Sequence, residues 1–365
     1  MLFFMFIGAI GGVLGIYYFE TKFSGDVSSG QFFFVMSVII VELYIAVFLQ
    51  IIIHEVGHLV AGLISGYKFS SFRIGNLMWI KEDKKIKFRR MSLLGTGGQC
   101  LMSPPDMKNG QIPFVFYNMG GSLMNFITLP VSIWVFFFCK ELLYLELFFL
   151  IMGIVGLVIS LMNGIPLQFG TVNNDGYNVK EMSKSSESLR SFWVQMKIME
   201  ETSKGIRLKD MPKEWFSLPD EIEMKNSMVA TLAVCYANRL MDAQKFEEAI
   251  TVIDSLLSMD SAIVGLHRRL LICDRIFCEL IGDRNSQVIE KLYDKEQVKF
   301  MKQMAKFPTV IRTEYVYELI FKGDVKKAEQ IKDKFEKCAK TYPYSTDMES
   351  ERELIQIASH KLISS

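Results

Sequence analysis

Charged side chains are scarce in the first half of this 365-residue chain. Only 22 of its 81 charged residues lie within residues 1–180, and the other 59 lie within residues 181–365. The whole chain is 50% hydrophobic and contains 29 phenylalanines, which is too apolar for an ordinary soluble protein of this length. We therefore predict a membrane domain over residues 1–180 and a water-soluble domain over residues 181–365.

Features typical of several other protein classes are also missing. The net charge is +1, and no basic stripe with interleaved aromatic residues occurs, so we expect no nucleic-acid partner. The six cysteines form no C-x-x-C pair and no regular framework. This pattern argues against a disulfide scaffold and predicts reduced thiols in a protein that faces the cytosol.

Long apolar runs are the first feature that is present. A membrane-spanning helix needs about 20 apolar residues. The segment 2–19 has a signal peptide as its rival interpretation, but it lacks a basic start and a small-residue cleavage site, so we predict a retained helix. The segment 32–64 exceeds one bilayer thickness, and we place its membrane part at 44–64. Four spans are predicted in total, at 2–19, 32–64, 113–139 and 142–164.

The loop 65–112 sets the expected orientation. It carries nine basic residues against three acidic ones, so the positive-inside rule places it in the cytoplasm and the loop 20–31 outside. Four spans across the lipid bilayer of the cell membrane then leave both termini and the second domain in the cytoplasm. Within the loop, Lys68–Ile74 and Lys85–Met91 indicate short strands, and glycines follow. We expect a small β-hairpin or a membrane-dipping loop here.

The pentapeptide His54-Glu55-Val56-Gly57-His58 lies inside the second apolar run. On a helix, His54 and His58 share one face and can bind one Zn²⁺. Glu55 is placed to act as general base on a metal-bound water. Ionisable groups in a membrane helix cost roughly 2.5–3.5 kcal/mol each on insertion scales, which argues against an idle role. His54 would lie about 15 Å inside the membrane from the Ser65 end.

A catalytic zinc site needs a third protein ligand. The remaining histidines, His267 and His360, lie in the charged second half of the chain. A carboxylate is therefore the better candidate. Asp175 follows the fourth span on the cytoplasmic side, where the motif helix also ends, and Glu181 is a weaker rival.

Four segments within residues 40–180 resemble the site-2 protease family of intramembrane zinc metalloproteases, peptidase family M50. The resemblance implies that His54, His58 and Asp175 bind zinc and that Glu55 is the base. It also implies that Asn125, Asn163, Gly97 and Gly98 help to hold the substrate. The four segments are the H-E-x-x-H motif, the glycine-rich Gly97–Met102, Gly121–Phe126, similar to Gly-Pro-x-x-Asn, and Asn163–Gly176, similar to Asn-x-x-Pro followed by Asp-Gly.

The chain departs from the family pattern at three points. Ser122 replaces the proline of the third motif, and the stretch from Pro166 to Asp175 is longer than the compact family version. No insertion of the size of a PDZ domain is present. Substrate presentation must therefore use another part of the chain, for which the second domain is the candidate.

Several polar or small residues near the motif have two interpretations. Asn125 could form an interhelical hydrogen bond, and Gly120 and Gly121 could permit close helix approach. Gln50, one turn before His54, could orient an imidazole or make a plain helix contact. Cys100 is either a regulatory zinc ligand or a buried inert thiol.

The sequence of the second domain predicts a series of amphipathic helices. We predict an antiparallel helix pair at Asn226–Leu240 and Phe246–Leu257, which resembles a tetratricopeptide-type hairpin. The segment Phe321–Asp324, followed by Ala328, shows a weaker similarity to the same pattern. A simple helical bundle is the alternative. The fold class expected for the whole chain is thus an all-α polytopic membrane protein with a soluble α-helical domain.

These features predict an intramembrane zinc metalloprotease that cuts a membrane-embedded protein or peptide in or beside its transmembrane segment. Family analogy suggests a membrane-tethered anti-sigma factor, a remnant signal peptide or a secreted-peptide precursor as substrate. Residues 181–365 are expected to bind a cytoplasmic segment of the substrate or a cytoplasmic partner protein. The alternative function is a catalytically silent zinc-binding scaffold that acts through these helices. A transporter is less supported, because no repeated pair of broken helices is evident.

Overall fold

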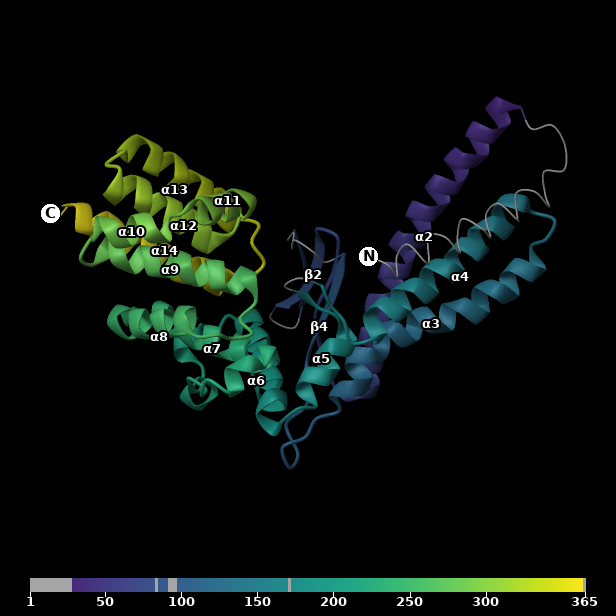
Figure 1. Ribbon diagram of the computed structural model, residues 1–365, viewed down its shortest axis with the longest axis horizontal. Coiled ribbons are helices and arrows are strands. Elements are labelled where there is room, and N and C mark those ends of the chain that lie inside the picture. The colour runs from purple at the N-terminus through teal and green to yellow at the C-terminus, as the bar shows by residue number, and fades with distance from the viewer. Residues whose placement is uncertain (1–27, 83–84, 91–96, 170–171, 364–365) are drawn as a thin grey trace. The chain divides into compact units, whose positions relative to one another are not determined.

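The computed structural model of this chain describes residues 28–82, 85–90, 97–169 and 172–363 (Figure 1). The chain divides into two compact units. The first contains the chain up to Ser65, Pro113–Leu167 and Asn173–Val179. The second contains Gly66–Ile112, Gln168–Val172 and the chain from Lys180. The chain enters the second unit for the last time at Lys180, next to the boundary between residues 180 and 181 expected from the distribution of charge. The loop 66–112 also belongs to the second unit.

Three long helices build the first unit: α2 (Ser29–Ile64), α3 (Phe114–Phe138) and α4 (Leu143–Gly164). Each is long and apolar enough to cross a membrane. They confirm the helices expected at 32–64, 113–139 and 142–164, whereas the expected span at 2–19 lies outside the described residues. Helix α2 has 36 residues and a length of about 54 Å, which exceeds the roughly 30 Å of bilayer hydrocarbon.

The start of α2 is fixed by a capping box. The Ser28 hydroxyl accepts from the backbone N–H of Gln31, and the Gln31 side chain accepts from the backbone N–H of Ser28. Two of the N–H groups that have no partner within the helix are thereby satisfied. The helix then runs without interruption through the metal motif.

The helices of the first unit are apolar outside and more polar inside. Phe33, Tyr44, Trp134 and Phe138 expose 68–80% of their surface, as expected of side chains that face lipid. The buried faces carry small and polar residues instead. These include Gln50, His54, His58, Asn125 and Ser160.

Glycines bring the three helices into backbone contact. A Cβ on Gly57 of α2 would lie 2.4 Å from the carbonyl oxygen of Gly120, and a Cβ on Gly120 of α3 would lie 2.5 Å from that of Gly57. A Cβ on Gly156 of α4 would lie 2.6 Å from Gln50 Nε2. Helices in lipid associate through such small residues. The interpretation of Gly120 as a point of close helix approach is confirmed.

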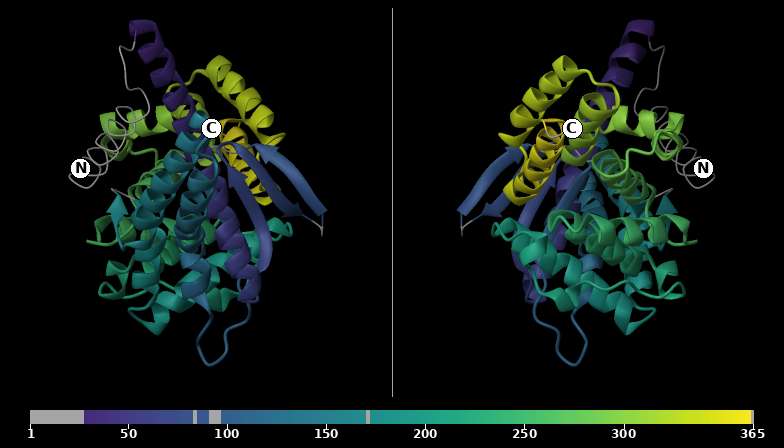
Figure 2. Two further views of the ribbon diagram at one scale, coloured as in Figure 1. Left: turned by 90° about the vertical axis from the view of Figure 1, so that its right-hand side faces the viewer. Right: turned by 90° about the vertical axis from the view of Figure 1, so that its left-hand side faces the viewer.

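Four strands form an antiparallel sheet in the second unit (Figures 1 and 2). They are β1 (Lys68–Ile74), β2 (Leu77–Glu82), β3 (Lys85–Arg90) and β4 (Gly98–Ser103), in the order β3-β2-β1-β4. The strands expected at Lys68–Ile74 and Lys85–Met91 are confirmed. The expectation of a single hairpin or a membrane-dipping loop was too simple, because β2 and β4 were missed. Local sequence hides β4, since its partner β1 lies more than 20 residues away.

One face of this sheet packs on helices of the same unit. Met78 and Ile80 of β2 are buried in a cluster with Met199 of α6 (Ser186–Ser203) and with Tyr344. The Trp193 indole N–H donates to the carbonyl oxygen of Pro105 over 2.9 Å. Alternate side chains of a strand point to opposite faces, so Leu77 and Trp79 of β2 are exposed. These contacts explain why the loop belongs to the second unit.

The rest of the second unit is helical. The pair α7 (Ser227–Asp242) and α8 (Phe246–Ser258) confirms the predicted antiparallel helices. A tetratricopeptide assignment stays a prediction. The further helices are α5 (Asp175–Met182), which begins in the first unit, α9 (Gly265–Ile281), α10 (Ser286–Leu292), α11 (Lys295–Gln303), α12 (Pro308–Val316), α13 (Val325–Ala339) and α14 (Ser345–Ile363), with a π-helical turn at Tyr317–Phe321 and 3-10 turns at Leu208–Asp210, Lys213–Trp215 and Glu223–Lys225.

Two helix junctions of this unit share one local arrangement. Gln244 and Gly323 each precede a helix and have positive φ angles of 58° and 69°. Ala249 and Ala328, five residues further on in each case, are both fully buried. The similarity noted in the sequence between these two segments therefore has a structural counterpart.

Replacing Gly120 with alanine should destabilise the first unit. The added Cβ meets backbone on the facing helix, and overpacking of this kind costs about 1–3 kcal/mol. Gly30→Ala is the matched control, because a Cβ there meets nothing within 4 Å. Thermal unfolding of the purified protein in detergent should show a lower midpoint for Gly120→Ala only. Equal midpoints for the two variants would contradict the close approach.

Candidate metal centre

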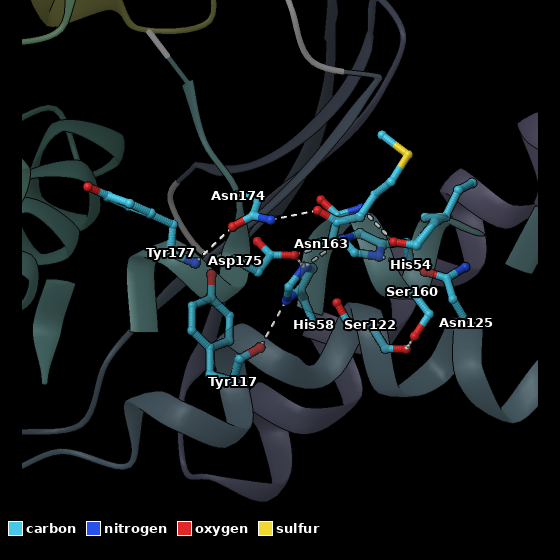
Figure 3. Close-up of polar contacts among 12 residues, drawn as sticks. His54, His58, Tyr117, Ser122, Asn125, Ser160, Asn163, Asn174, Asp175 and Tyr177 are labelled. Atoms are coloured by element: carbon cyan, nitrogen blue, oxygen red, sulfur yellow. Dashed lines mark hydrogen bonds and ion pairs between the residues drawn. The ribbon is translucent and has the colours of Figure 1, made fainter. Parts of the chain in front are cut away.

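His54, His58 and Asp175 point toward one another (Figure 3). The two histidines lie one turn apart on α2, and their Nε2 atoms are 3.1 Å apart. Asp175 Oδ2 lies 3.0 Å from His54 Nε2 and 3.3 Å from His58 Nε2. A search of the described residues for clustered His, Cys, Asp or Glu side chains that could hold a metal ion gives these three residues. The predicted triad is thus brought together in the first unit.

Hydrogen bonds fix the tautomers of both imidazoles. His58 Nδ1 donates to the carbonyl oxygen of Tyr117 over 2.9 Å, and a carbonyl can only accept. His54 Nδ1 lies 2.7 Å from Asn125 Oδ1. The Asn125 nitrogen donates to the carbonyl oxygen of Gln50, so the Asn125 oxygen faces His54. In both neutral rings the proton sits on Nδ1, and Nε2 keeps its lone pair for a metal.

The arrangement therefore presents three acceptors to one point. Two imidazole nitrogens and a carboxylate oxygen at 3.0–3.3 Å from one another repel unless a positive charge lies among them. A tetrahedral Zn²⁺ with bonds of about 2.0–2.1 Å separates its ligands by about 3.4 Å. The donor set and the spacing fit this ion.

A polar network on the three helices supports His54. The Asn125 side chain is fully buried, and its nitrogen also donates to Gln50 Oε1 over 2.7 Å. Gln50 Nε2 donates in turn to Thr128 Oγ1 and to the carbonyl oxygen of Met152, each over 2.9 Å. Gln50 thereby links α2 to α3 and α4 and holds the amide that orients His54. The sequence left two interpretations of Gln50 open, and the structure shows that it makes interhelical contacts and reaches His54 only through Asn125.

Gly121 of α3 leaves room for the imidazoles. A Cβ there would lie 2.5 Å from His54 Cε1 and 2.6 Å from His58 Nε2. Any side chain at this position would displace the ligands. Gly121 thus serves the metal centre directly, while its neighbour Gly120 serves helix packing.

Asn174 positions Asp175, and sequence reasoning did not identify it. Its Oδ1 accepts from the backbone N–H of Tyr177 over 2.8 Å, which caps the start of α5 (Figure 3). Its Nδ2 donates to the carbonyl oxygens of Met162 and Ile165 at the end of α4, each over 2.6 Å. An asparagine directly before an acidic first turn of a helix was the available clue.

A backbone hydrogen bond joins the two ends of the lengthened connection before Asp175. The backbone N–H of Asn174 donates to the carbonyl oxygen of Leu167 over 3.2 Å. Between them, β5 (Gln168–Phe169) and β6 (Val172–Asn173) pair with each other. A Cβ on Gly176 would lie 2.3 Å from the carbonyl oxygen of Gly164, so α5 starts against the end of α4. The extra residues therefore do not move Asp175 away from the histidines.

The other predicted site residues have different surroundings. Glu55 is buried on α2 beside the ligands, with 7% of its surface exposed. Asn163 donates to the carbonyl oxygen of Ile159 within α4. The carbonyl oxygens of Gly97 and Gly98, in the second unit, accept from the backbone N–H of Gly75 and from the Arg73 guanidinium.

The rival ligands are not part of the metal group. Glu181 pairs with Lys184 and accepts from the backbone N–H of Ser227 in the second unit. Cys100 is a buried residue of β4. His267 lies on α9 and His360 on α14.

Removing the Asn125 amide should weaken metal binding without removing a ligand. Loss of a residue that orients a ligand typically lowers metal affinity about 10–100-fold. Asn118→Ala is the control, because Asn118 is buried on the same helix and its side chain, within the described residues, donates only to the carbonyl oxygen of Phe114. Zinc titration of the two purified variants against a competing chelator measures the difference. An unchanged affinity in Asn125→Ala would show that the His54 contact does not matter.

A bundle of apolar helices that encloses an H-E-x-x-H motif and an aspartate defines a membrane metallohydrolase. Residues 42–205 match the sequence model of Peptidase family M50. This segment, which contains every residue of the metal centre, is similar to the site-2 protease family of membrane metalloproteases. No match was found among curated proteins or solved structures.

Proposed function

We propose that this protein is a zinc-dependent intramembrane endopeptidase that hydrolyses a peptide bond in or next to the transmembrane segment of a membrane-bound substrate. The observation that carries this proposal is the convergence of three acceptor atoms beside a buried glutamate within an apolar bundle. A bound Zn²⁺ would lower the pKa of a water molecule to about 7 and polarise the scissile carbonyl. His54, His58 and Asp175 would hold the ion.

Glu55 has the position of the general base. It follows His54 directly and precedes His58 by three residues, so the helix keeps it next to both ligands. Burial removes it from competing bulk water. In the proposed reaction Glu55 takes a proton from the attacking water and delivers it to the leaving amine.

A groove between α3 and α4 offers a path for the substrate. It has a volume of about 300 Å³ and is lined by Met119, Ser122, Leu123, Phe126, Ser160, Leu161, Gly164 and Ile165. The Ser122 side chain is 3% exposed, and its hydroxyl has no hydrogen-bond partner within the described chain. A helical substrate must unwind before attack, which frees its backbone groups for such a hydroxyl. We infer that Ser122 binds the unwound substrate backbone.

The amide of Asn125 is occupied by contacts within the protein. Its oxygen faces His54 and its nitrogen faces Gln50. These contacts support a role in positioning the ligand rather than in holding the substrate. Asn163, Gly97 and Gly98 stay proposed substrate contacts on the family resemblance.

We infer from the basic loop 65–112 that the metal centre opens toward the cytoplasm and that the second unit is cytoplasmic. The substrates that family analogy suggests, namely an anti-sigma factor, a remnant signal peptide or a peptide precursor, are compatible with this orientation. Comparative peptidomics of cells with active and inactive protein would name the substrate, because uncleaved precursors accumulate.

Glu55→Gln should abolish proteolysis and leave metal content unchanged, because the amide cannot accept the proton and the three ligands remain. Glu146→Gln is the control, since Glu146 is also a buried carboxylate of the bundle but lies in the first turn of α4. Cleavage of accumulated precursors by each variant, together with zinc content, measures the outcome. Wild-type cleavage by Glu55→Gln would overturn the mechanism, and unchanged function in cells would favour the scaffold.

Ser122→Ala should lower kcat/KM about fivefold to tenfold, which corresponds to one hydrogen bond of roughly 1 kcal/mol. Protein stability should not fall, because the hydroxyl has no partner in the described chain. Ser132→Ala is the control, since Ser132 is buried on the same helix but does not line the groove. An unchanged kcat/KM for Ser122→Ala would remove this residue from the substrate path.

A further inference from the structure

The second unit contains an acidic cavity of about 250 Å³. It lies among the end of α7, the first half of α9, the residues that start α12, and α14. Four carboxylates line it, from Asp242, Asp274, Asp347 and Glu351. Apolar side chains, including Leu270, Phe307 and Leu354, form other parts of the wall.

Three of the four carboxylates have a cationic partner. The Arg207 guanidinium donates to Asp242 over 3.0 Å. Arg312 is fully buried and lies 2.6 Å from Asp274 and 3.1 Å from Glu351. Two arginines thus face four acidic groups, and the cavity keeps an excess of negative charge.

In the part of the chain that the structure describes, Asp347 is the one of these four carboxylates without a cationic partner. Within the described residues it makes no hydrogen bond or ion pair, and it lines the cavity. Burial, together with repulsion from Glu351 and Asp242, raises its pKa to about 7. An unpaired acid of this kind is costly to bury. A cation in the cavity would offset this cost.

A second, independent feature points to a ligand. Thr346 lines the cavity with only 4% of its surface exposed, and its hydroxyl has no hydrogen-bond partner in the described structure. Nδ1 of His267, another lining residue, also lacks a hydrogen bond there. Buried polar atoms are normally satisfied. Three polar groups from α9 and α14 are therefore open to a ligand in one cavity.

The composition of the wall decides what kind of cation fits. Over the described residues, the group with the spacing of metal ligands is that of the first unit, and the acids of this cavity do not form one. The wall combines acids with apolar side chains, which matches an ammonium or guanidinium group on an aliphatic stem. A lysine or arginine side chain has this chemistry.

We propose that this cavity binds a lysine or arginine side chain of a peptide, with the cationic group at Asp347 and Thr346 and the stem against the apolar wall. The ligand is a segment of the protease substrate, a step that rests on the proposed function. Membrane proteins carry lysine and arginine next to the cytoplasmic ends of their spans. The cavity would select substrates by this basic flank.

The binding test uses the full chain with Glu55→Gln in detergent, so that no peptide is cleaved. The probe is a rhodamine-labelled nonapeptide with three lysines spaced by alanines, and its twin carries norleucine in place of each lysine. Fluorescence anisotropy should show binding of the lysine peptide at least tenfold tighter than that of the norleucine peptide. Equal affinity for the two peptides would overturn the proposal.

Asp347→Asn should weaken binding of the lysine peptide about tenfold. Glu349→Gln is the matched control, because it removes one negative charge from the exposed side of the same helix, outside the cavity. Asp347→Asn removes an unpaired charge, so its thermal midpoint should stay the same or rise. Thr346→Val, which preserves shape, should also weaken binding. If both cavity variants bind as the Glu349→Gln control does, the site lies elsewhere.

Two further arms separate the sources of the cation and the two proposals. Spermidine tests a free polyamine, and its binding without binding of the lysine peptide would overturn the peptide assignment. In the catalytically intact protein, Asp347→Asn should raise KM for a substrate with a basic flank and leave kcat unchanged. An unchanged KM would refute substrate selection by this cavity. A protein that cleaves nothing would refute the proposed function, while the anisotropy result would still stand.

Discussion

One constraint governs the metal centre. The fold holds three lone-pair acceptors close together, and these acceptors repel one another. His54 Nε2, His58 Nε2 and Asp175 Oδ2 lie within 3.0–3.3 Å of one another. Hydrogen bonds place the imidazole protons on the far side of both rings. Such an arrangement is stable only around a positive charge. The close helix contacts, the polar network and the cap on α5 all serve to maintain it.

Each support acts through a short chain of contacts. Gln50 holds Asn125, and Asn125 holds His54. Asn174 joins the end of α4 to the start of α5 and so places Asp175. In an apolar medium no water is present to form a hydrogen bond with an unsatisfied polar group, so these contacts leave the site few alternative arrangements. The bundle is consequently rigid where the chemistry requires precision and apolar where it meets lipid.

The second unit has a different physical character. Its helices enclose a core of apolar side chains, and its buried charges are mostly paired, as for Arg312 with Asp274. Asp347 departs from this pattern. The unit also contains the sheet formed by residues 68–103, although that segment lies between two membrane helices in the sequence. A loop between two apolar helices is here part of the fold of the second unit.

The sequence by itself determined the apolar helices at 32–64, 113–139 and 142–164, the helix pair at α7 and α8, and the choice of His54, His58 and Asp175 as candidate metal ligands. These features depend on local hydrophobicity and on residue spacing along one helix, which a sequence displays directly. Only the tertiary structure decided the roles of Asn125, Asn174 and Gly121, the strands β2 and β4, and the unpaired Asp347. Those properties arise from contacts between segments far apart in the chain, where distance and desolvation, rather than residue type, set the chemistry.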